Sequence, residues 1–122
     1  MGNIKTYKDL LIWQKGIEIV LLTYKLAKSF PQHEIYALTS QIKRASVSIP
    51  SNIAEGYGRN TDKSFSNFID ISRGSLYELE TQLIIAQQLE FIQDIETFNK
   101  VIGLINEESK MINSFYKSLA KS

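Results

Sequence analysis

The sequence contains no cysteine, which excludes disulfide bonds, thiolate metal ligands and cysteine nucleophiles. The lack of cysteine is compatible with a reducing cytoplasm, which is the location that we expect. Only two prolines and six glycines occur among the 122 residues. Because these residues are the strongest local breaks in regular structure, their scarcity favours long helices joined by short turns. The length fits one folding unit, so we expect a single domain over residues 1–122.

Long hydrophobic runs are also missing. No segment approaches the roughly 18 uninterrupted apolar residues that a membrane-spanning helix needs, and the N-terminus has no apolar signal-peptide core. The start Met1-Gly2-Asn3 fits the loose pattern for N-terminal myristoylation. That pattern is short and common, so a chance match is the preferred interpretation. We expect no association with a membrane.

Residues and motifs that support catalysis are scarce. The sequence has none of the GxxxxGK, GxGxxG, HExxH and GxSxG patterns that mark phosphate, dinucleotide, zinc and acyl-transfer sites. Its one histidine, His33, lies in a polar segment after Pro31, where solvation is the usual role. The Glu-x-x-His pairs of di-metal helix bundles are absent. We therefore expect no enzymatic activity, no catalytic residue, no metal and no cofactor.

Apolar residues recur at alternating spacings of three and four in four segments of the chain. This spacing draws an apolar stripe along a helix, so it predicts helices over residues 7–28, 34–57, 62–89 and 94–120. The connections between these segments are short, and short connections make consecutive helices antiparallel neighbours. The predicted fold class is all-α, an up-down-up-down antiparallel four-helix bundle.

Single residues refine the predicted helix ends. Asn60 or Thr61 is suited to cap the start of the third helix, and Asp94 the start of the fourth. The glycines in segment 56–58 allow a left-handed cap at the end of the second helix. Gly74 lies inside the third helix, where glycine weakens a helix. We interpret it as a sign that another helix approaches closely at this position.

The first and fourth helices carry more apolar residues than one neighbouring surface can bury. The predicted core stripe of the first helix is Leu10, Trp13, Ile17, Val20, Tyr24 and Ala27, and a second apolar set is Ile12, Ile19, Leu22 and Leu26. The fourth helix has its own second set at Val101, Leu104, Met111 and Phe115. Exposed apolar faces of this extent would be a liability in a monomer, which favours self-association. The alternative is that a wide core absorbs both sets.

The charged residues balance to a formal net charge of +1. This balance does not suggest a nucleic-acid-binding protein, because attraction to phosphate supplies most of that affinity. The distribution is more informative, since all three arginines fall in one segment of the chain. The candidate nucleic-acid-binding residues are Lys43, Arg44, Arg59, Lys63 and Arg73. Acidic residues of the same segment, among them Glu55, Asp62 and Asp70, could instead hold these charges in ion pairs.

A polar line runs along the predicted second helix, opposite its apolar stripe. The members of this line are Arg44, Ser48, Ser51 and Glu55. Arg44 and Glu55 are about 16 Å apart along a helix, so they cannot pair with each other and each needs a partner elsewhere. A plain solvent-exposed face is the alternative interpretation. Together with the second apolar sets, the line gives the candidate oligomer interface: Ile12, Ile19, Leu22, Arg44, Ser48, Ser51, Glu55, Val101, Leu104, Met111 and Phe115.

The segment QIKRASVSIPSNIAEGYGR, residues 41–59, resembles the four-helix bundle proteins named after intervening sequences in bacterial 23S ribosomal RNA genes. Further matching segments are Tyr7–Leu10, Phe30–Pro31 and Gly74–Leu79. Glu90 departs from the family pattern, which tends to have glycine there. More distantly, the chain is similar to the accessory variability protein of diversity-generating retroelements, a basic pentameric bundle that binds nucleic acid and a reverse transcriptase. This chain lacks that strongly basic balance.

The resemblance implies an up-down bundle that assembles into a ring, a homopentamer in relatives. Two functional hypotheses follow from the resemblance and the charge distribution. The first is a non-enzymatic homo-oligomeric bundle that binds nucleic acid, with structured RNA favoured over DNA, through the Lys/Arg cluster. The alternative is a protein-interaction scaffold ring that docks a partner protein and uses the same charges as interface ion pairs.

Overall fold

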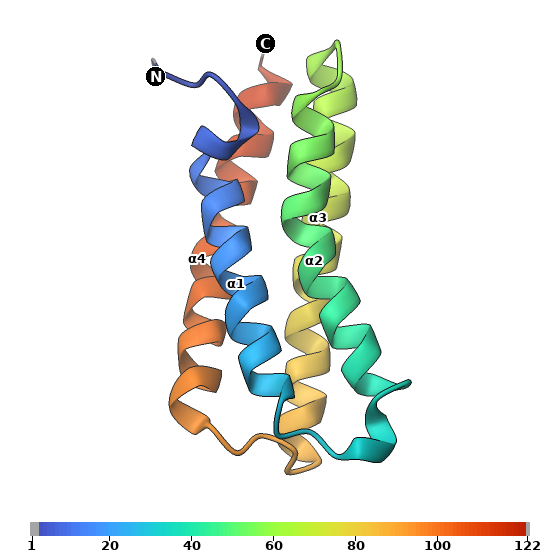
Figure 1. Ribbon diagram of the computed structural model, residues 1–122. Helices are drawn as coiled ribbons and strands as arrows, with labels where there is room; N and C mark the ends of the chain where they lie inside the picture. Colours follow the sequence, from blue (N-terminus) through green and yellow to red (C-terminus); the bar gives the residue numbers. More distant parts are fainter. Residues whose placement is uncertain (1–2, 122) are drawn as a thin grey trace.

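The chain folds into four long helices and two short 3-10 helices. The computed structural model describes residues 3–121. Its long helices are α1 (Leu11–Ala27), α2 (Leu38–Tyr57), α3 (Asp62–Gln88) and α4 (Ile95–Ala120), and its 3-10 helices are η1 (Tyr7–Asp9) and η2 (Gln32–Glu34). Consecutive long helices run in opposite directions (Figure 1). The predicted all-α four-helix bundle is therefore confirmed, whereas Met1 and Gly2 of the acylation pattern lie outside the described residues.

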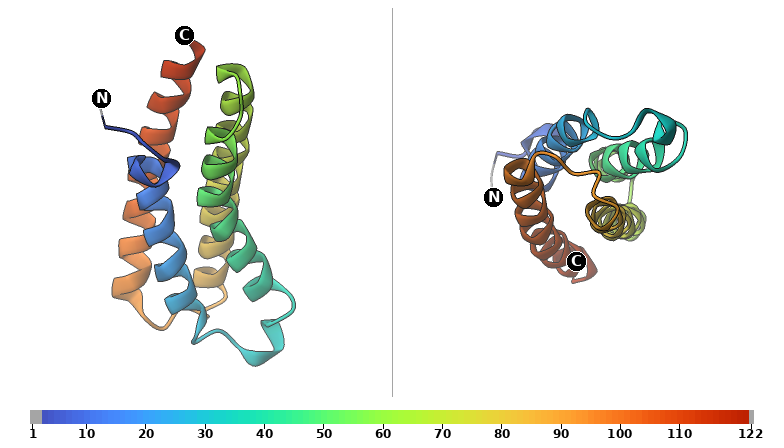
Figure 2. Two further views of the ribbon diagram at one scale, coloured as in Figure 1. Left: turned by 45° about the horizontal axis from the view of Figure 1, so that its top comes forward. Right: turned by 90° about the horizontal axis from the view of Figure 1, so that it is seen from below.

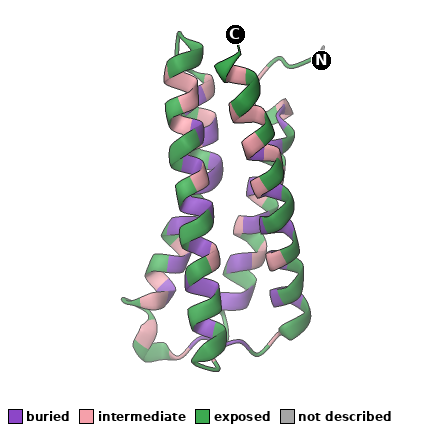
Figure 3. Ribbon diagram, turned by 180° about the vertical axis from the view of Figure 1, so that it is seen from behind, coloured by how far each residue is buried: buried purple, intermediate pink, exposed green. Residues whose placement is uncertain are grey.

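Each long helix packs against two neighbours, in the pairs α1–α2, α2–α3, α3–α4 and α4–α1. Seen along the bundle, the helices surround a common centre (Figure 2). The largest aliphatic side chains in this centre are completely buried: Ile19, Leu26, Ile42, Ile49, Ile53, Ile69, Leu76, Leu79, Leu83, Ile105 and Ile112. Buried residues follow the facing sides of the helices, and exposed residues follow the outer sides (Figure 3). Burial of each such side chain contributes about 1.5–3 kcal/mol, which makes this core the main source of stability.

The third and fourth helices begin with the side-chain caps that the sequence predicts. Thr61 accepts a hydrogen bond from the backbone N–H of Ser64 at 3.1 Å, and Asp94 accepts one from the backbone N–H of Thr97 at 3.0 Å. The Thr97 hydroxyl donates a second hydrogen bond to Asp94. These hydrogen bonds hold the pKa of Asp94 below its usual value, because they stabilise the carboxylate form.

The first two helices begin later than the periodicity predicts. Thr6 and Asp9 form a capping box around η1, and Leu10 is extended (φ −75°, ψ 128°) before α1 begins. Glu34 ends η2, and its carboxylate accepts a hydrogen bond at 3.2 Å from the backbone N–H of Leu38, where α2 begins. In both places a polar side chain accepts hydrogen bonds from the backbone near the start of the helix and so gives the backbone an alternative to a continuous helix. Apolar spacing carries no information about this competition.

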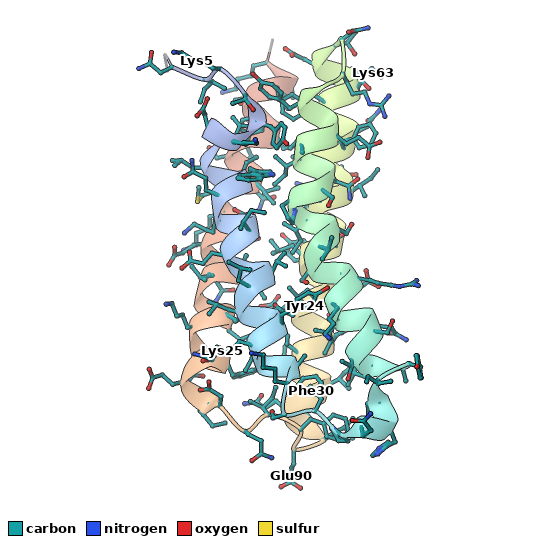
Figure 4. The ribbon with its side chains drawn as sticks, in the orientation of Figure 1. Lys5, Tyr24, Lys25, Phe30, Lys63 and Glu90 are labelled. Carbon is teal, nitrogen blue, oxygen red and sulfur yellow. The ribbon has the colours of Figure 1, made fainter. Side chains whose placement is uncertain are left out.

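The helix ends differ from the prediction in a related way. Gly58 follows α2 with φ −79°, so the predicted left-handed glycine cap at this end is wrong. The left-handed cap lies instead at the end of α3, where Glu90 has φ 63°. The backbone N–H groups of Glu90 and Phe91 donate to the carbonyls of Gln87 and Ala86, each at 2.9 Å, which is the Schellman pattern. Glu90 lies at the tip of the α3–α4 turn and its side chain points away from the bundle (Figure 4).

Replacing Glu90 with glycine should stabilise the protein by about 1 kcal/mol, because a side chain in the left-handed region carries a steric cost that glycine avoids. Urea unfolding followed by far-UV circular dichroism measures the change. Gln93→Gly is the matched control, since Gln93 lies in the same connection and does not have a positive φ. The control should lose stability, and equal effects at the two positions would show that the turn geometry is not responsible.

Glycines mark two close contacts between helices. A Cβ on Gly16 of α1 would lie 3.2 Å from the Pro50 Cβ of α2. A Cβ on Gly56 of α2 would lie 2.7 Å from the Phe68 Cβ of α3. Gly74 is different, because an added Cβ would have no neighbour within 4 Å among the described residues. The predicted close approach at Gly74 is therefore wrong within the chain, since this glycine lies on the exposed side of α3.

Candidate docking groove between helices α1 and α2

Helix α1 buries the apolar face that the sequence analysis placed second. Its core-facing residues include Ile12, Gly16 and Ile19, all of them buried. Trp13 and Ile17 of the predicted core stripe are only half-buried. Periodicity detects both stripes but does not say which one faces inward. The small Gly16 decides this, because it allows α1 to approach Pro50 of α2 along the Ile12–Ile19 side.

The candidate oligomer interface is corrected accordingly. Ile12 and Ile19 are 3% and 0% exposed, and Val101 and Leu104 of α4 are 0% and 9% exposed. These side chains form the core of one chain, so the prediction that they belong to an exposed second face is wrong. The remaining apolar candidates, Leu22, Met111 and Phe115, are partly buried and pack against that core.

The half-buried stripe of α1 lines a groove against α2, which we call the α1–α2 groove. One part has a volume of about 300 Å³ and is lined by Tyr7, Trp13, Ile17, Val20, Val47, Pro50, Ser51 and Ala54. The other part has a volume of about 700 Å³ and is lined by Tyr24, Ile35, Tyr36, Thr39, Ser40, Lys43, Arg44, Val47, Ser48, Ser51 and Asn52. Both parts include Val47 and Ser51, so they adjoin along α2.

The α1–α2 groove is apolar and carries positive charge at one end. Tyr36 is 96% exposed, and Ile35, Tyr24 and Val47 are each about 40% exposed. Lysine and arginine occur among the lining residues, whereas aspartate and glutamate do not. A surface of this composition is typical of docking sites for other macromolecules, which use aromatic side chains and arginine.

Lys43 and Arg44 lie at the positive end of the α1–α2 groove. The Lys43 ammonium lies over the Tyr24 ring, 4.9 Å from its centroid, which holds the cation at the surface. Arg44 is exposed and forms no hydrogen bond or ion pair with the residues between 3 and 121. Of the five predicted nucleic-acid-binding residues, these two are the ones that the structure places in the groove.

The other two arginines are held by neighbours within the chain. Arg59 pairs with Glu55 at 3.1 Å and stacks on the Phe68 ring at 4.5 Å. Arg73 pairs with Asp70 on its own helix. The Arg73 guanidinium also reaches α4, where it donates a hydrogen bond to the Asn113 side-chain oxygen at 2.9 Å and lies 4.7 Å from the centroid of the Tyr116 ring. These contacts occupy the guanidinium group.

The five predicted cations do not gather on one surface. Lys63 is exposed in the first turn of α3, at the end of the bundle where α2 connects to α3 (Figure 4). Tyr24, whose ring is in contact with the Lys43 ammonium, lies toward the opposite end (Figure 4). Arg73 is turned toward α4. Arg59 and Arg73 are therefore held in ion pairs, as the alternative interpretation of the sequence proposed. The five side chains do not form a single extended Lys/Arg patch.

The predicted polar line of α2 divides between two neighbours. Both Ser48 and Ser51 line the α1–α2 groove, but the Ser48 hydroxyl is also hydrogen-bonded to the Ser75 hydroxyl of α3 at 2.7 Å. Glu55 finds its partner in Arg59, four residues further along the chain. The partner of Glu55 therefore lies just after the end of α2 and within the same chain.

Comparison with known proteins places the chain in a family. The family model of the 23S rRNA-intervening sequence protein matches residues 8–114. This chain belongs to that family. Among solved structures, a protein of unknown function from the S23 ribosomal protein family of Bacteroides thetaiotaomicron superposes with a TM-score of 0.79 at 23% identity, covering 88% of this chain and 99% of that chain. Identity this low shows the shared fold alone. No curated protein matches the chain.

This family member also contains a buried acid that the sequence analysis missed. Glu108 of α4 is 0% exposed, and neither carboxyl oxygen has a hydrogen-bond partner in the described residues. Burial raises the pKa of Glu108 to about 8, although Lys15 acts in the opposite direction. The signal was present in the sequence, since Val101, Ile105, Glu108 and Ile112 follow the same alternating spacing.

Residues 3–121 contain no group of three or more His, Cys, Asp or Glu side chains that could hold a metal ion. Among the described residues, no helix is both long enough and apolar enough to cross a membrane. The α1–α2 groove is the candidate functional site.

Proposed function

We propose that this protein is a non-enzymatic, cytoplasmic, self-associating bundle that works as an interaction module, with the α1–α2 groove as its docking surface. One observation carries the proposal. Trp13, Ile17, Val20 and Tyr24 form the most regular apolar stripe of the chain, and they line the groove without being buried in the core. Leaving such a stripe in water is unfavourable, and a docked surface removes that cost.

The first occupant that we propose is a second copy of the chain, docking through the outer side of α3. Ile71 and Ile85 are 51% and 43% exposed, and exposed Glu78 lies midway between them at a spacing of seven residues. This stripe offers apolar side chains for the groove and a carboxylate for its positive end. Since the two surfaces differ, repeated docking is head-to-tail, and a head-to-tail contact that closes gives a ring.

Substitutions in the groove test this proposal. Val20→Glu places a charge in the groove, so we expect it to reduce the mass measured by light scattering to that of one chain, 13.9 kDa. Leu21→Glu is the matched control, because Leu21 is the next residue of α1, is 65% exposed and lies outside the groove. The control should keep the wild-type mass. Equal loss of assembly in both variants, with helix content preserved, would contradict the proposal.

The family resemblance gives the expected subunit number, five. The same light-scattering measurement on the wild-type protein counts subunits as a multiple of 13.9 kDa. A further partner protein would then dock on the outside of the ring through residues that assembly leaves exposed.

Structured RNA is the second candidate ligand, favoured by one observation. Lys43 and Arg44 lie beside Tyr24 and Tyr36, and cations next to aromatic rings suit unpaired bases. Titration with ribosomal RNA fragments at low and high salt separates the two candidates. Binding that weakens with salt, is lost in a Lys43→Ala, Arg44→Ala double variant and persists in Arg59→Ala would replace protein docking with RNA. Protein docking predicts no such binding.

A further inference from the structure

Glu108 lies where the two walls of the α1–α2 groove meet the core. Its Oε2 atom would be 3.5 Å from a Cβ placed on Gly16, and the same Cβ would be 3.2 Å from the Pro50 Cβ. The carboxyl group therefore lies against the backbone of α1 at the point where α1 contacts α2. Because Gly16 has no side chain, the Glu108 carboxyl group and Pro50 both lie close to the same point of the α1 backbone.

The same helix contact forms part of the groove. Pro50 lines the narrower part of the groove from the α2 side. Trp13 and Ile17, which flank Gly16 on α1, line it from the other side. Any separation of α1 from α2 at Gly16 therefore changes the position of three residues that form the groove wall.

We propose that Glu108 regulates the α1–α2 groove by gaining or losing one proton. The neutral carboxyl group is tolerated in the core and keeps α1 packed on α2 and α4. The carboxylate has no hydrogen-bond donor among the described residues, so ionisation draws water toward it and loosens the Gly16–Pro50 contact. The identity of what the groove binds rests on the proposed function, but the response of the groove to ionisation does not.

Few charged groups act on Glu108. From α1, the Lys15 ammonium favours the carboxylate, but it is held by Glu107 of α4 at 2.7 Å. The buried residues of α2 and α3 include no titratable side chain. On α3 the Arg73 guanidinium is engaged by Asp70, Asn113 and Tyr116. Burial therefore dominates, and the group releases its proton at a pH near 8 rather than in the usual acid range.

The single tryptophan of the chain is a built-in reporter, because Trp13 lines the groove. We expect its emission to shift to longer wavelength as the pH rises, with a midpoint near pH 8 and with unchanged far-UV circular dichroism. Glu108→Gln should hold the emission at its low-pH position throughout. Glu96→Gln is the matched control, because Glu96 is an exposed carboxylate on the same helix and does not contact Lys15, the cation that acts on Glu108. It should keep the shift.

Two results would overturn the inference. One is the same pH-dependent shift in Glu108→Gln as in the wild type. The other is a wild-type shift that coincides with loss of helix content, because this shows global unfolding instead of a change in the groove. Light scattering at the lowest and highest pH of the titration measures the assembled mass, and it therefore distinguishes a failure of the proposed function from a failure of the regulation by Glu108. A shift without any assembled species contradicts only the proposed function, and assembly without a shift contradicts only the regulation by Glu108.

Discussion

Glu108→Gln should make the folded protein more stable than the wild type by about 5 kcal/mol at about pH 9, and by less than about 1 kcal/mol at about pH 5. The reason is that folding raises the pKa of Glu108 from 4.5 to about 8 by removing the carboxylate from water. The folded state thus binds the proton more tightly than the unfolded state. Stability from this group is complete below about pH 4.5 and is lost as the pH rises toward 8.

Urea unfolding of the wild type and Glu108→Gln across this pH range measures the difference. Glu96→Gln is the control, because Glu96 carries the same charge on the same helix but is exposed. The control should follow the pH dependence of the wild type. If Glu108→Gln follows it as well, Glu108 ionises as an ordinary exposed carboxyl group, which would contradict its burial in the core.

Gly56→Ala should destabilise the protein by about 2 kcal/mol, in the range found for overpacked cores. The new methyl group would lie 2.7 Å from the Phe68 Cβ and 2.8 Å from the Phe65 Cδ1. The Phe65 ring can rotate, but the Phe68 Cβ is fixed to the backbone of α3. Relief of the contact therefore requires α2 and α3 to move apart, along a contact that also includes the Ser72 hydrogen bond to the Ile49 carbonyl.

Gly103→Ala is the matched control for this substitution, because Gly103 lies inside α4 and an added Cβ there meets nothing within 4 Å among the described residues. It should stabilise the protein by about 1 kcal/mol, since alanine favours a helix over glycine. Thermal and urea unfolding measure both changes. A neutral Gly56→Ala variant would show that the α2–α3 contact adjusts without cost.

The sequence predicted the number and order of the helices because their apolar spacing is regular and the breaks between them are short. The caps at Thr61 and Asp94 were predicted for the same local reason. The buried face of α1 was predicted wrongly. Two apolar stripes compete on this helix, and the choice depends on how closely α1 approaches Pro50 at Gly16, a contact between residues far apart in the sequence.

The candidate site was predicted only in part. The ion pairs of Arg59 with Glu55 and of Arg73 with Asp70 span four and three residues, so sequence spacing alone indicates them. Sequence spacing does not indicate the contacts of these arginines with aromatic rings or the contact of Lys43 with Tyr24, because they depend on how the helices pack. The α1–α2 groove itself was missed, because its stripe was assigned to the core.

Solvent access to Trp13 tests the central claim most directly, because this residue is the only tryptophan and lines the α1–α2 groove. Acrylamide quenching of its fluorescence is measured from dilute to concentrated protein while light scattering follows the mass. If the groove is the docking surface, quenching falls as the mass rises above 13.9 kDa. A mass that rises without any change in quenching would place the assembly contact elsewhere and contradict the claim.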